Sequence, residues 1–591
     1  MQNVFGTYKK SDPVLFDSRS ALYKYPFGAV GTHDVVKVSF PVRKDLMARG
    51  VKLILRRNDS SKEYDLHYLG EENGYDVFSA DFTVTIEGTY FYRFEIYPVS
   101  GGILYCGKGK GGSAIIGEWL PEWQLSVYQS HYETADFIKG GVVYHIFCDR
   151  FAKKGDFCAE PGYGTKKEWD EDVTIVDPDG VYRANDFFGG NFDGMTEKLP
   201  YLQSLGVTAI YLSPIFSSNS NHRYDTADYN VVDPVLGGDE AFLRFLRACK
   251  RRGMEVILDG VFNHTGADSV YFNKFGHFDS LGAYQSKESP YYDWYTFYDF
   301  PEKYHCWWGC TVVPTVARDA QGFHELIAGK NGLLRKWTKA GVKGWRLDVV
   351  DELSEYFVKK IRESIKSTDK KALLIGEVWE DASTKYSYGE EREYFFGYDL
   401  DGVMNYVFRD AIHAYIGDGD GEKFVESVLT IMENYPKRSL DTCLTMIDSH
   451  DTVRAINAFA GVNGFGMSKE EKKAYRLSEE EYARGKRRLM IASALQYFLP
   501  GVPSLYYGDE AGLQGFEDPL NRRPYPWGKE DRELLEHYRR LGQLRAEYRD
   551  DFKGEAKLSS ENGDVRIERG SVCLTVHMRE ERFEIERIRT E

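Results

Sequence analysis

The stretch "GWRLDVVDE", residues 344–352, places two opposite charges inside an apolar run that we predict to be a buried β-strand. Side chains in a strand alternate between its two faces, so Arg346 and Asp348 point the same way. The apolar residues between and beside them can then face a packed layer. A charged pair on one face of a core strand needs an explanation beyond packing, because buried charges are costly unless they are paired or used.

Similar apolar runs recur through the middle of the chain, mostly with helix-like segments between them. Near-continuous apolar strands that alternate with helices indicate a parallel sheet covered on its outer face. With one weaker run the count reaches eight, which predicts an α/β fold of the (β/α)8 TIM-barrel type, whose active site lies where the strands end. The predicted strands are 142–149, 207–214, 254–262, 342–350, 372–379, 398–406 (the weaker run), 444–448 and 503–508.

The segments on either side of the predicted barrel are rich in β-formers. Residues 1–118 contain short strands separated by turns, which predicts an N-terminal β-sandwich. The barrel is expected over 119–550, entered through a connector punctuated by Pro and Gly. The link between its third and fourth strands is too long for an ordinary connection, so we expect an inserted lobe at about 263–330, rich in aromatic residues. Residues 551–591 predict a short C-terminal β-domain.

Composition narrows the range of partners. The 591 residues carry 76 Lys and Arg against 92 Asp and Glu, and the net charge of -16 disfavours nucleic acid and anionic membranes. The N-terminus lacks the apolar run of a signal peptide, so we expect a cytoplasmic protein. Among the eight cysteines, only Cys306 and Cys310 are close, in "CWWGC". No second Cys or His pair gives them a zinc-site spacing, so we expect reduced, packed thiols.

Carboxylates fall at the ends of four predicted strands. A single Asp after a strand is more often a helix cap or turn former. Several carboxylates over one barrel mouth repel one another, which is costly unless a reaction uses them. Hydrolysis of a glycosidic bond uses a carboxylate with a carboxylic acid, and a neighbouring Arg346 would keep Asp348 ionised and oriented. The strand-end residues are Asp259 with Asn263 and His264, Asp348, Glu377, and Asp448 with His450 and Asp451.

The segments "DGVFNH", "GWRLDVVDE", "GEVW" and "IDSHD" occur in this order and resemble the four signature regions of the alpha-amylase family of glycoside hydrolases. Three more segments, "YHIFCDRF", "HRYDTADYNVVDPVLGG" and "YYGDEAGLQGFEDPLNRRPYPW", are similar to its neopullulanase, cyclomaltodextrinase and maltogenic amylase branch. The resemblance is firm over 136–530, and the N-terminal module resembles a starch-binding-type domain. It implies a retaining hydrolase of α-1,4-glucosidic bonds in maltooligosaccharides, cyclodextrins, starch or pullulan.

The same resemblance assigns roles to individual residues. It implies Asp348 as the nucleophile, Glu377 as the general acid/base, and Asp451 as the third carboxylate, which acts through sugar hydroxyls. His264 and His450 would donate hydrogen bonds to the sugar, and Tyr224 would be its stacking platform. Asp259 would mainly be a structural partner. The implied substrate-binding set is Arg346, His264, His450, Tyr224, Asp259 and Arg454.

Two features depart from the family pattern. The stretch "WWGCTVVPTVARD" matches the branch's fifth region only loosely, which leaves linkage preference open. The branch often has a calcium loop after the first strand, but here that loop offers only Asp156 as a clear acidic ligand, and hard cations want six or more oxygens. We therefore predict no required cofactor and no calcium site in that loop, while "GGNFDG" at 189–194 could supply part of a different one.

Other functions compatible with these residues stay open. A 4-α-glucanotransferase would pass the same glycosyl-enzyme to a sugar hydroxyl instead of water. A non-catalytic glucan-binding relative would have lost its carboxylates, whereas all three are present in this sequence. Relatives with such an N-terminal domain often form homodimers through it, which the resemblance extends to this chain.

Overall fold

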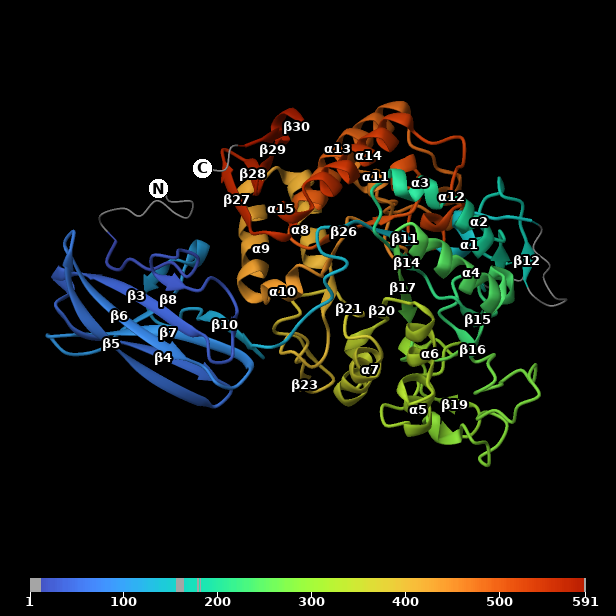
Figure 1. Ribbon diagram of the computed structural model, residues 1–591, viewed down its shortest axis with the longest axis horizontal. Helices are drawn as coiled ribbons and strands as arrows, with labels where there is room; N and C mark the ends of the chain where they lie inside the picture. The colour runs from blue at the N-terminus through green and yellow to red at the C-terminus, as the bar shows by residue number, and fades with distance from the viewer. Residues whose placement is uncertain (1–11, 156–163, 178–179, 181, 589–591) are drawn as a thin grey trace. The chain divides into compact units, whose positions relative to one another are not determined.

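The structure is a computed structural model that describes residues 12–155, 164–177, 180 and 182–588 (Figure 1). The chain forms two compact units, each built from segments that are separate in the sequence. The first unit comprises the described part of Met1–Glu133 together with Asp381–Asp399 and Val425–Leu440. The second comprises the described parts of Thr134–Glu380, Leu400–Phe424 and Asp441–Glu591.

The first unit is built around a ten-stranded, mostly antiparallel sheet with strand order β1-β3-β6-β5-β4-β7-β10-β2; β8 pairs with β7, and β9 pairs with β8. Only the β10–β2 pair is parallel. The strands are β1 (Lys24–Tyr25), β2 (Val30–Gly31), β3 (Val35–Arg43), β4 (Ala48–Arg57), β5 (Ser60–Glu72), β6 (Tyr75–Thr83), β7 (Gly88–Pro98), β8 (Leu104–Lys108), β9 (Ala114–Ile116) and β10 (Trp123–Tyr128).

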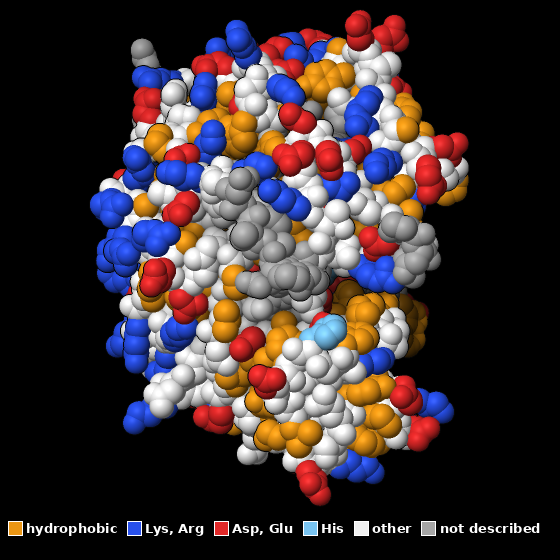
Figure 2. Space-filling model, turned by 90° about the vertical axis from the view of Figure 1, so that its right-hand side faces the viewer, with side chains coloured by type: hydrophobic (Ala, Val, Ile, Leu, Met, Phe, Trp, Pro, Cys, Tyr) orange, Lys and Arg blue, Asp and Glu red, His pale blue; other side chains and the backbone are white. Residues whose placement is uncertain are grey.

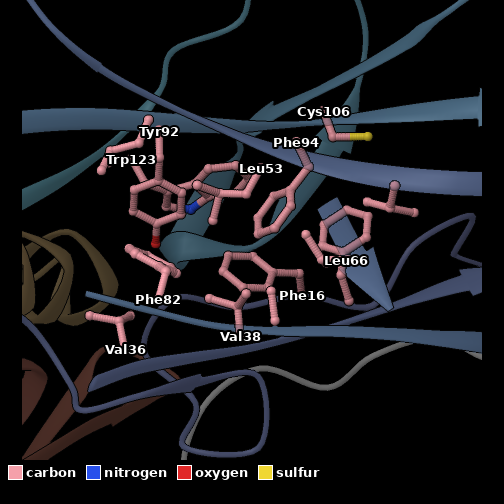
Figure 3. Packing of buried hydrophobic residues seen from close by; sticks show 14 of the residues in the cluster. Phe16, Val36, Val38, Leu53, Leu66, Phe82, Tyr92, Phe94, Cys106 and Trp123 are labelled. Carbon is pink, nitrogen blue, oxygen red and sulfur yellow. The ribbon is translucent and has the colours of Figure 1, made fainter. Parts of the chain in front are cut away.

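Aromatic side chains fill the core of this sheet. Figure 3 shows labelled residues from opposite strands pointing toward one another, as alternating side chains on two facing layers must. The rings of Tyr92 and Trp123 stack with centroids 5.5 Å apart. Trp123 begins β10, which lies in the stretch that the sequence predicted to be a connector. The prediction of strand-rich structure at the N-terminus is confirmed, but the sheet continues to Tyr128 because β10 pairs with β7.

Eight parallel strands close into a barrel in the second unit, and all eight coincide with runs predicted from the sequence. Their residues are buried almost throughout, which explains the near-continuous apolar runs. The register pairs Asp259 with Arg346 across neighbouring strands. The strands are β11 (Val143–Ile146), β14 (Ala209–Leu212), β17 (Glu255–Gly260), β20 (Gly344–Leu347), β21 (Leu373–Val378), β24 (Gly402–Asn405), β25 (Leu444–Thr445) and β26 (Val502–Tyr506).

Helices connect most of the strands, and their apolar faces are buried. Among the described residues, no helix is long and apolar enough to cross a membrane. The helices are α1 (Cys148–Phe151), α2 (Phe192–Glu197), α3 (Leu199–Ser204), α4 (Gly238–Arg251), α5 (Gln321–Ala328), α6 (Leu333–Ala340), α7 (Glu355–Thr368), α8 (Tyr406–Asp418), α9 (Gly421–Asn434), α10 (Lys437–Leu440), α11 (Ala455–Phe459), α12 (Lys469–Ala474), α13 (Glu479–Phe498), α14 (Arg532–Glu547) and α15 (Arg549–Lys553).

Two additions to the barrel match the sequence-based expectation. Between β17 and β20 the chain builds a lobe containing a small antiparallel pair and α5. After α15 a four-stranded antiparallel sheet follows, in the order β27-β28-β29-β30. The remaining strands are β12 (Thr165–Lys166), β13 (Asp186–Phe187), β15 (Phe216–Ser218), β16 (Thr226–Val232), β18 (Phe297–Asp299), β19 (Lys303–Tyr304), β22 (Tyr386–Ser387), β23 (Glu390–Glu391), β27 (Ala556–Glu561), β28 (Asp564–Arg569), β29 (Val572–His577) and β30 (Arg582–Arg587).

Candidate active site

Arg346, on β20, is the centre of the candidate site. Its Nη1 donates to Asp348 Oδ1 at 2.8 Å and to Asp259 Oδ1 at 2.8 Å. Its Nη2 lies 2.8 Å from Glu377 Oε2 as an ion pair. One fully buried guanidinium therefore gathers carboxylates from three neighbouring strands, β17, β20 and β21. The two charges of the 344–352 stretch do share one face, as alternation in a strand requires.

Glu377 is held by three groups besides its own strand. The Val349 N–H donates to Glu377 Oε2 at 2.9 Å, and Val349 has a left-handed backbone with φ 39° and ψ 50°. That conformation is strained for a β-branched residue and turns this N–H toward the carboxylate. Trp379 Nε1 donates to Glu377 Oε1 at 3.1 Å while its ring stacks on Tyr406 at 3.8 Å. Trp379 had no predicted role, although its place two residues after Glu377 puts both on one face.

Burial and neighbouring charges act together on the pKa of Asp348. The pKa of Asp348 is raised well above its usual value by burial, and the charges of Glu377, Asp259 and Asp451 add to this. Arg346 opposes the shift, but one cation is shared by several carboxylates. The expectation that Arg346 keeps Asp348 ionised stays a prediction. The carboxylates bind protons as a coupled group, whose titration belongs to the cluster and not to one residue.

Tyr224 and His450 form a second layer around Asp259. The Tyr224 hydroxyl lies 2.9 Å from Asp259 Oδ2 and 2.6 Å from His450 Nε2, and the two rings are nearly parallel. Burial holds the pKa of His450 well below its usual value, so the imidazole is neutral. We assign the Nε2 proton to the bond with Tyr224, which lets the Tyr224 hydroxyl donate to Asp259. Tyr211, also unpredicted, donates to the same oxygen at 2.6 Å.

His264 contacts the backbone of Tyr224. Its Nε2 is 3.1 Å from the Tyr224 carbonyl oxygen, and burial lowers its pKa to about 4. A neutral His264 that donates to this carbonyl fixes the backbone of Tyr224. Both histidines expected to donate to a sugar thus have Nε2 within hydrogen-bond distance of Tyr224, and His450 Nε2 also lies 3.3 Å from Asp451 Oδ1. Their hydrogen bonds to a sugar stay a prediction.

Arg454 is corrected from a substrate contact to an internal brace. Its side chain is fully buried, with Nη1 donating to the Tyr507 carbonyl at 2.6 Å and to Asp509 Oδ1 at 3.0 Å. Its Nε donates to the Asn521 carbonyl at 2.9 Å. A guanidinium enclosed in this way cannot touch a ligand. Asp259 is equally enclosed, which agrees with its expected structural role.

Asp451 is the most exposed of the three predicted catalytic carboxylates. Its side chain is 31% exposed, against 10% for Asp348 and 7% for Glu377. Arg522 Nη2 lies 3.6 Å from Asp451 Oδ1, and Arg522 Nε donates to the His450 carbonyl at 3.0 Å. Arg522 was not singled out from the sequence, because it lies about 70 residues away in a loop after β26.

A turn carrying two tryptophans stands beside these residues. Trp307 and Trp308 donate through Nε1 to Glu352 Oε1 at 3.1 and 2.9 Å. Asn263 Nδ2 donates to Glu352 Oε2 at 3.0 Å. Glu352 follows Asp348 by four residues, so the inserted lobe is anchored to the strand end that carries the charged pair. The cysteines of the described chain, including the two that flank this turn, are free thiols.

Comparison with known proteins decides the family. The model of the alpha-amylase catalytic domain matches residues 145–315 and 326–552. The chain belongs to the alpha-amylase family. It is 31% identical to neopullulanase 2 of Thermoactinomyces vulgaris, over 90% of this chain and 84% of that protein. A solved structure of the type III pullulan hydrolase from Thermococcus kodakarensis has a TM-score of 0.66 and 26% identity, covering 96% of this chain and 94% of that one.

Other relatives of this alpha-amylase-family chain are much longer. An amylopullulanase of Thermoanaerobacterium saccharolyticum is 31% identical over 90% of this chain, but the match covers only 44% of that protein. The chain thus spans less than half the length of the amylopullulanases it matches. The four motif regions of the family all contribute to the site around Arg346, through His264, Asp348, Glu377 and Asp451.

The residues considered for calcium have other partners in this member of the family. Asn191, in 189–194, caps α2 by accepting from the Gly194 N–H, and Asp193 pairs with Arg244. Asp156 lies outside the described residues. Over the described ranges, no group of three His, Cys, Asp or Glu side chains is arranged to hold a metal ion. Asp448 Oδ2 accepts a hydrogen bond from the Ala455 N–H at 2.8 Å, at the start of α11.

Proposed function

We propose that this protein is a retaining α-glucan hydrolase that cleaves α-1,4-glucosidic bonds through a covalent glycosyl-enzyme. The observation that supports this most is the contact of Arg346 with Asp348 and Glu377 at the mouth of the barrel. Retention needs one carboxylate to attack the anomeric carbon while a second, close by, protonates the leaving oxygen. Sharing one guanidinium keeps the two carboxyl groups near each other.

In the first step, Glu377 gives its proton to the glycosidic oxygen. The bond between that oxygen and the anomeric carbon breaks, and Asp348 forms an ester with the carbon. The Val349 N–H and the Trp379 indole then stabilise the carboxylate left on Glu377. The mechanism requires an ionised Asp348 and a proton on Glu377 when substrate is bound, so substrate binding must favour that arrangement.

In the second step, Glu377 takes a proton from water, and the resulting hydroxide breaks the ester to release Asp348. Asp451 binds sugar hydroxyls and stabilises the positive charge that develops on the ring in both steps. Tyr224 provides the flat face against the sugar, and its hydroxyl is tied to Asp259 and His450. Tyr224 thereby links the binding surface to the charge network.

The names of relatives suggest the substrates: pullulan, cyclodextrins, maltooligosaccharides and starch. A relative called neopullulanase 2 and one called type III pullulan hydrolase favour pullulan among them. Transfer to a sugar hydroxyl is the second candidate, because the same intermediate serves both reactions. The proposal also includes a homodimer formed through the N-terminal domain, which sedimentation of the purified chain would measure.

The test is product analysis with maltoheptaose, β-cyclodextrin and pullulan. Four chains are compared: wild type, Asp348→Asn, Glu377→Gln and Asp293→Asn. Asp293 is an exposed carboxylate of the inserted lobe and provides a matched loss of one negative charge. We expect short products from wild type and Asp293→Asn only, with losses of at least about 1,000-fold in the other two variants.

Each outcome separates the alternatives. Products longer than maltoheptaose at early times would favour the transferase. Wild-type rates in Asp348→Asn would overturn the nucleophile assignment. No product from wild type, combined with oligosaccharide binding, would favour a binding protein. The anomer released first, followed by NMR, tests retention directly, because a covalent intermediate gives the α-anomer.

A further inference from the structure

A recess on the barrel unit lies outside the site around Arg346. It holds about 200 Å³, which is the space of roughly six or seven water molecules at about 30 Å³ each. That volume suits one sugar ring and is too small for a folded polypeptide. Its walls come from the loop between β12 and β13 and from the loop after β26, two segments far apart in the sequence.

Aromatic rings form one wall of this recess. Trp169 Nε1 donates to the Tyr525 carbonyl at 3.0 Å, and Trp527 Nε1 donates to the Phe151 carbonyl at 2.6 Å. Both indole N–H groups are thus used inside the protein, and the remaining indole surface at the recess is apolar. Lys198 lies over the Trp527 ring at 3.7 Å and Lys153 over the Trp169 ring at 5.7 Å, so a cation lies closer to Trp527 than to Trp169. A ring held at its edge loses little entropy when a ligand stacks on it.

Charged side chains of both signs form the other wall. Asp172 accepts from Arg523 Nε and Nη2 at 2.7 and 3.1 Å, and it also pairs with Arg476 at 3.1 Å. At the rim, Asp170 pairs with Lys529 at 3.2 Å, and both are largely exposed. The lining contains three acidic and three basic residues, so its formal charge is zero.

The combination of a flat apolar platform with paired, planar polar groups selects the chemistry of the ligand. An anion would need cations that are not already neutralised, and a purely apolar ligand would leave the polar wall without partners. Sugar hydroxyls donate and accept, so they can bond to carboxylates and guanidiniums that ion pairs hold in place. Figure 2 shows acidic, basic and hydrophobic side chains mixed over one face of the molecule.

We propose that this recess is a second glucan-binding site, which takes one glucose unit of the same substrate and performs no chemistry. The choice of glucan as the neutral sugar rests on the proposed function. The recess is close to the active site along the chain: Arg522 contacts Asp451, whereas the next residue, Arg523, contacts Asp172. Consecutive residues therefore belong to the two sites.

Equilibrium dialysis with radiolabelled maltotriose tests the site. The parent is Asp348→Asn, which we expect to bind without turnover, so the count of bound sugars does not depend on catalysis. Adding Trp169→Ala should lower the number of maltotriose molecules bound per chain by one. Adding Phe275→Ala should not change it, because Phe275 is a largely exposed aromatic residue of the inserted lobe and does not line the recess. An unchanged number in Trp169→Ala would overturn the proposal.

A second set of variants covers the case in which Trp169→Ala fails to fold. Asp170→Ala and Lys529→Ala change only exposed rim side chains, so the fold should persist. Each should weaken the second binding event about threefold to tenfold while leaving the first unchanged. Parent-like binding in both would overturn the proposal. Failure of the hydrolysis assay together with loss of a site in Trp169→Ala would refute the proposed function alone.

Discussion

At the scale of single residues, the main feature is a buried cation that serves more carboxylates than it can neutralise. Arg346 faces Asp259, Asp348 and Glu377, and the pKa of Asp348 is raised first by burial and further by the neighbouring carboxylates. Such an arrangement costs folding stability, because charges leave water without full compensation. Proteins keep such costs mainly where a reaction uses them.

Replacing Asp348 with Asn should therefore stabilise the barrel. An acid whose folded pKa is raised makes the protein lose stability as pH rises from the unfolded value, about 3.9, toward the folded value. Asn removes that loss, so we expect an apparent melting temperature higher by ~1–3 °C at pH 7 and little change near pH 4. Calorimetry from pH 4 to 8 measures this, with Asp293→Asn as the control. A gain independent of pH would contradict the charge explanation.

The Tyr224 hydroxyl should contribute to catalysis separately from the ring. In Tyr224→Phe the ring remains, but Asp259 and His450 each lose a hydrogen-bond partner. We expect kcat/KM to fall about 5- to 30-fold, corresponding to ~1–2 kcal/mol, with substrate affinity less affected than kcat. Tyr298→Phe is a matched change at an exposed hydroxyl in the inserted lobe. Equal effects in the two variants would show that the Tyr224 network is unimportant.

At the scale of elements, the loops that follow the barrel strands supply and position residues of the site. The loop after β26 supplies Arg522 to Asp451, and buried Arg454 ties this loop to the chain that follows β25. Each bond joins segments about 50 to 70 residues apart. The position of Arg522 therefore depends on how these loops pack.

Arg454→Met should lower stability without impairing substrate binding directly. The variant removes the partner of Asp509 and leaves a buried carboxylate, which costs ~3–5 kcal/mol in comparable cases. We expect a lower melting temperature, with KM for maltoheptaose within twofold of wild type at temperatures where the variant is folded. Arg540→Met, at an exposed position on α14, is the control. A raised KM with unchanged stability would restore the substrate-contact assignment.

At the scale of the whole molecule, each unit is assembled from distant pieces of chain. In the first unit, Arg19 is nearly buried and pairs with Glu433 at 3.2 Å and with Glu426 at 2.7 Å. Both partners come from the segment Val425–Leu440, roughly 400 residues later. The aromatic core of this unit, by contrast, lies wholly between residues 14 and 127.

A fragment of residues 1–133 should fold but be less stable than the same region in the full chain. Its core is complete, whereas Arg19 loses both carboxylates. We expect faster hydrogen exchange around Arg19 in the fragment than in the full chain. We also expect the Arg19→Met substitution to raise the midpoint of unfolding of the fragment and to lower that of the full chain. The control is to measure the effect of Arg19→Met in both the fragment and the full chain. The same sign of effect in the two would indicate that the later segment does not support this unit.

The sequence by itself determined the eight barrel strands, the β-rich ends and the set of carboxylates at the strand ends. These depend on local patterns: apolar runs, their alternation with helices, and the rule that parallel strands end at one edge. Only the tertiary structure decided which groups surround those carboxylates. It turned Arg454 inward, brought Tyr211, Trp379 and Arg522 to the site, and placed β10 in the first sheet. Such contacts join residues far apart in the chain, so their geometry comes from tertiary packing. Local sequence periodicity does not determine that packing.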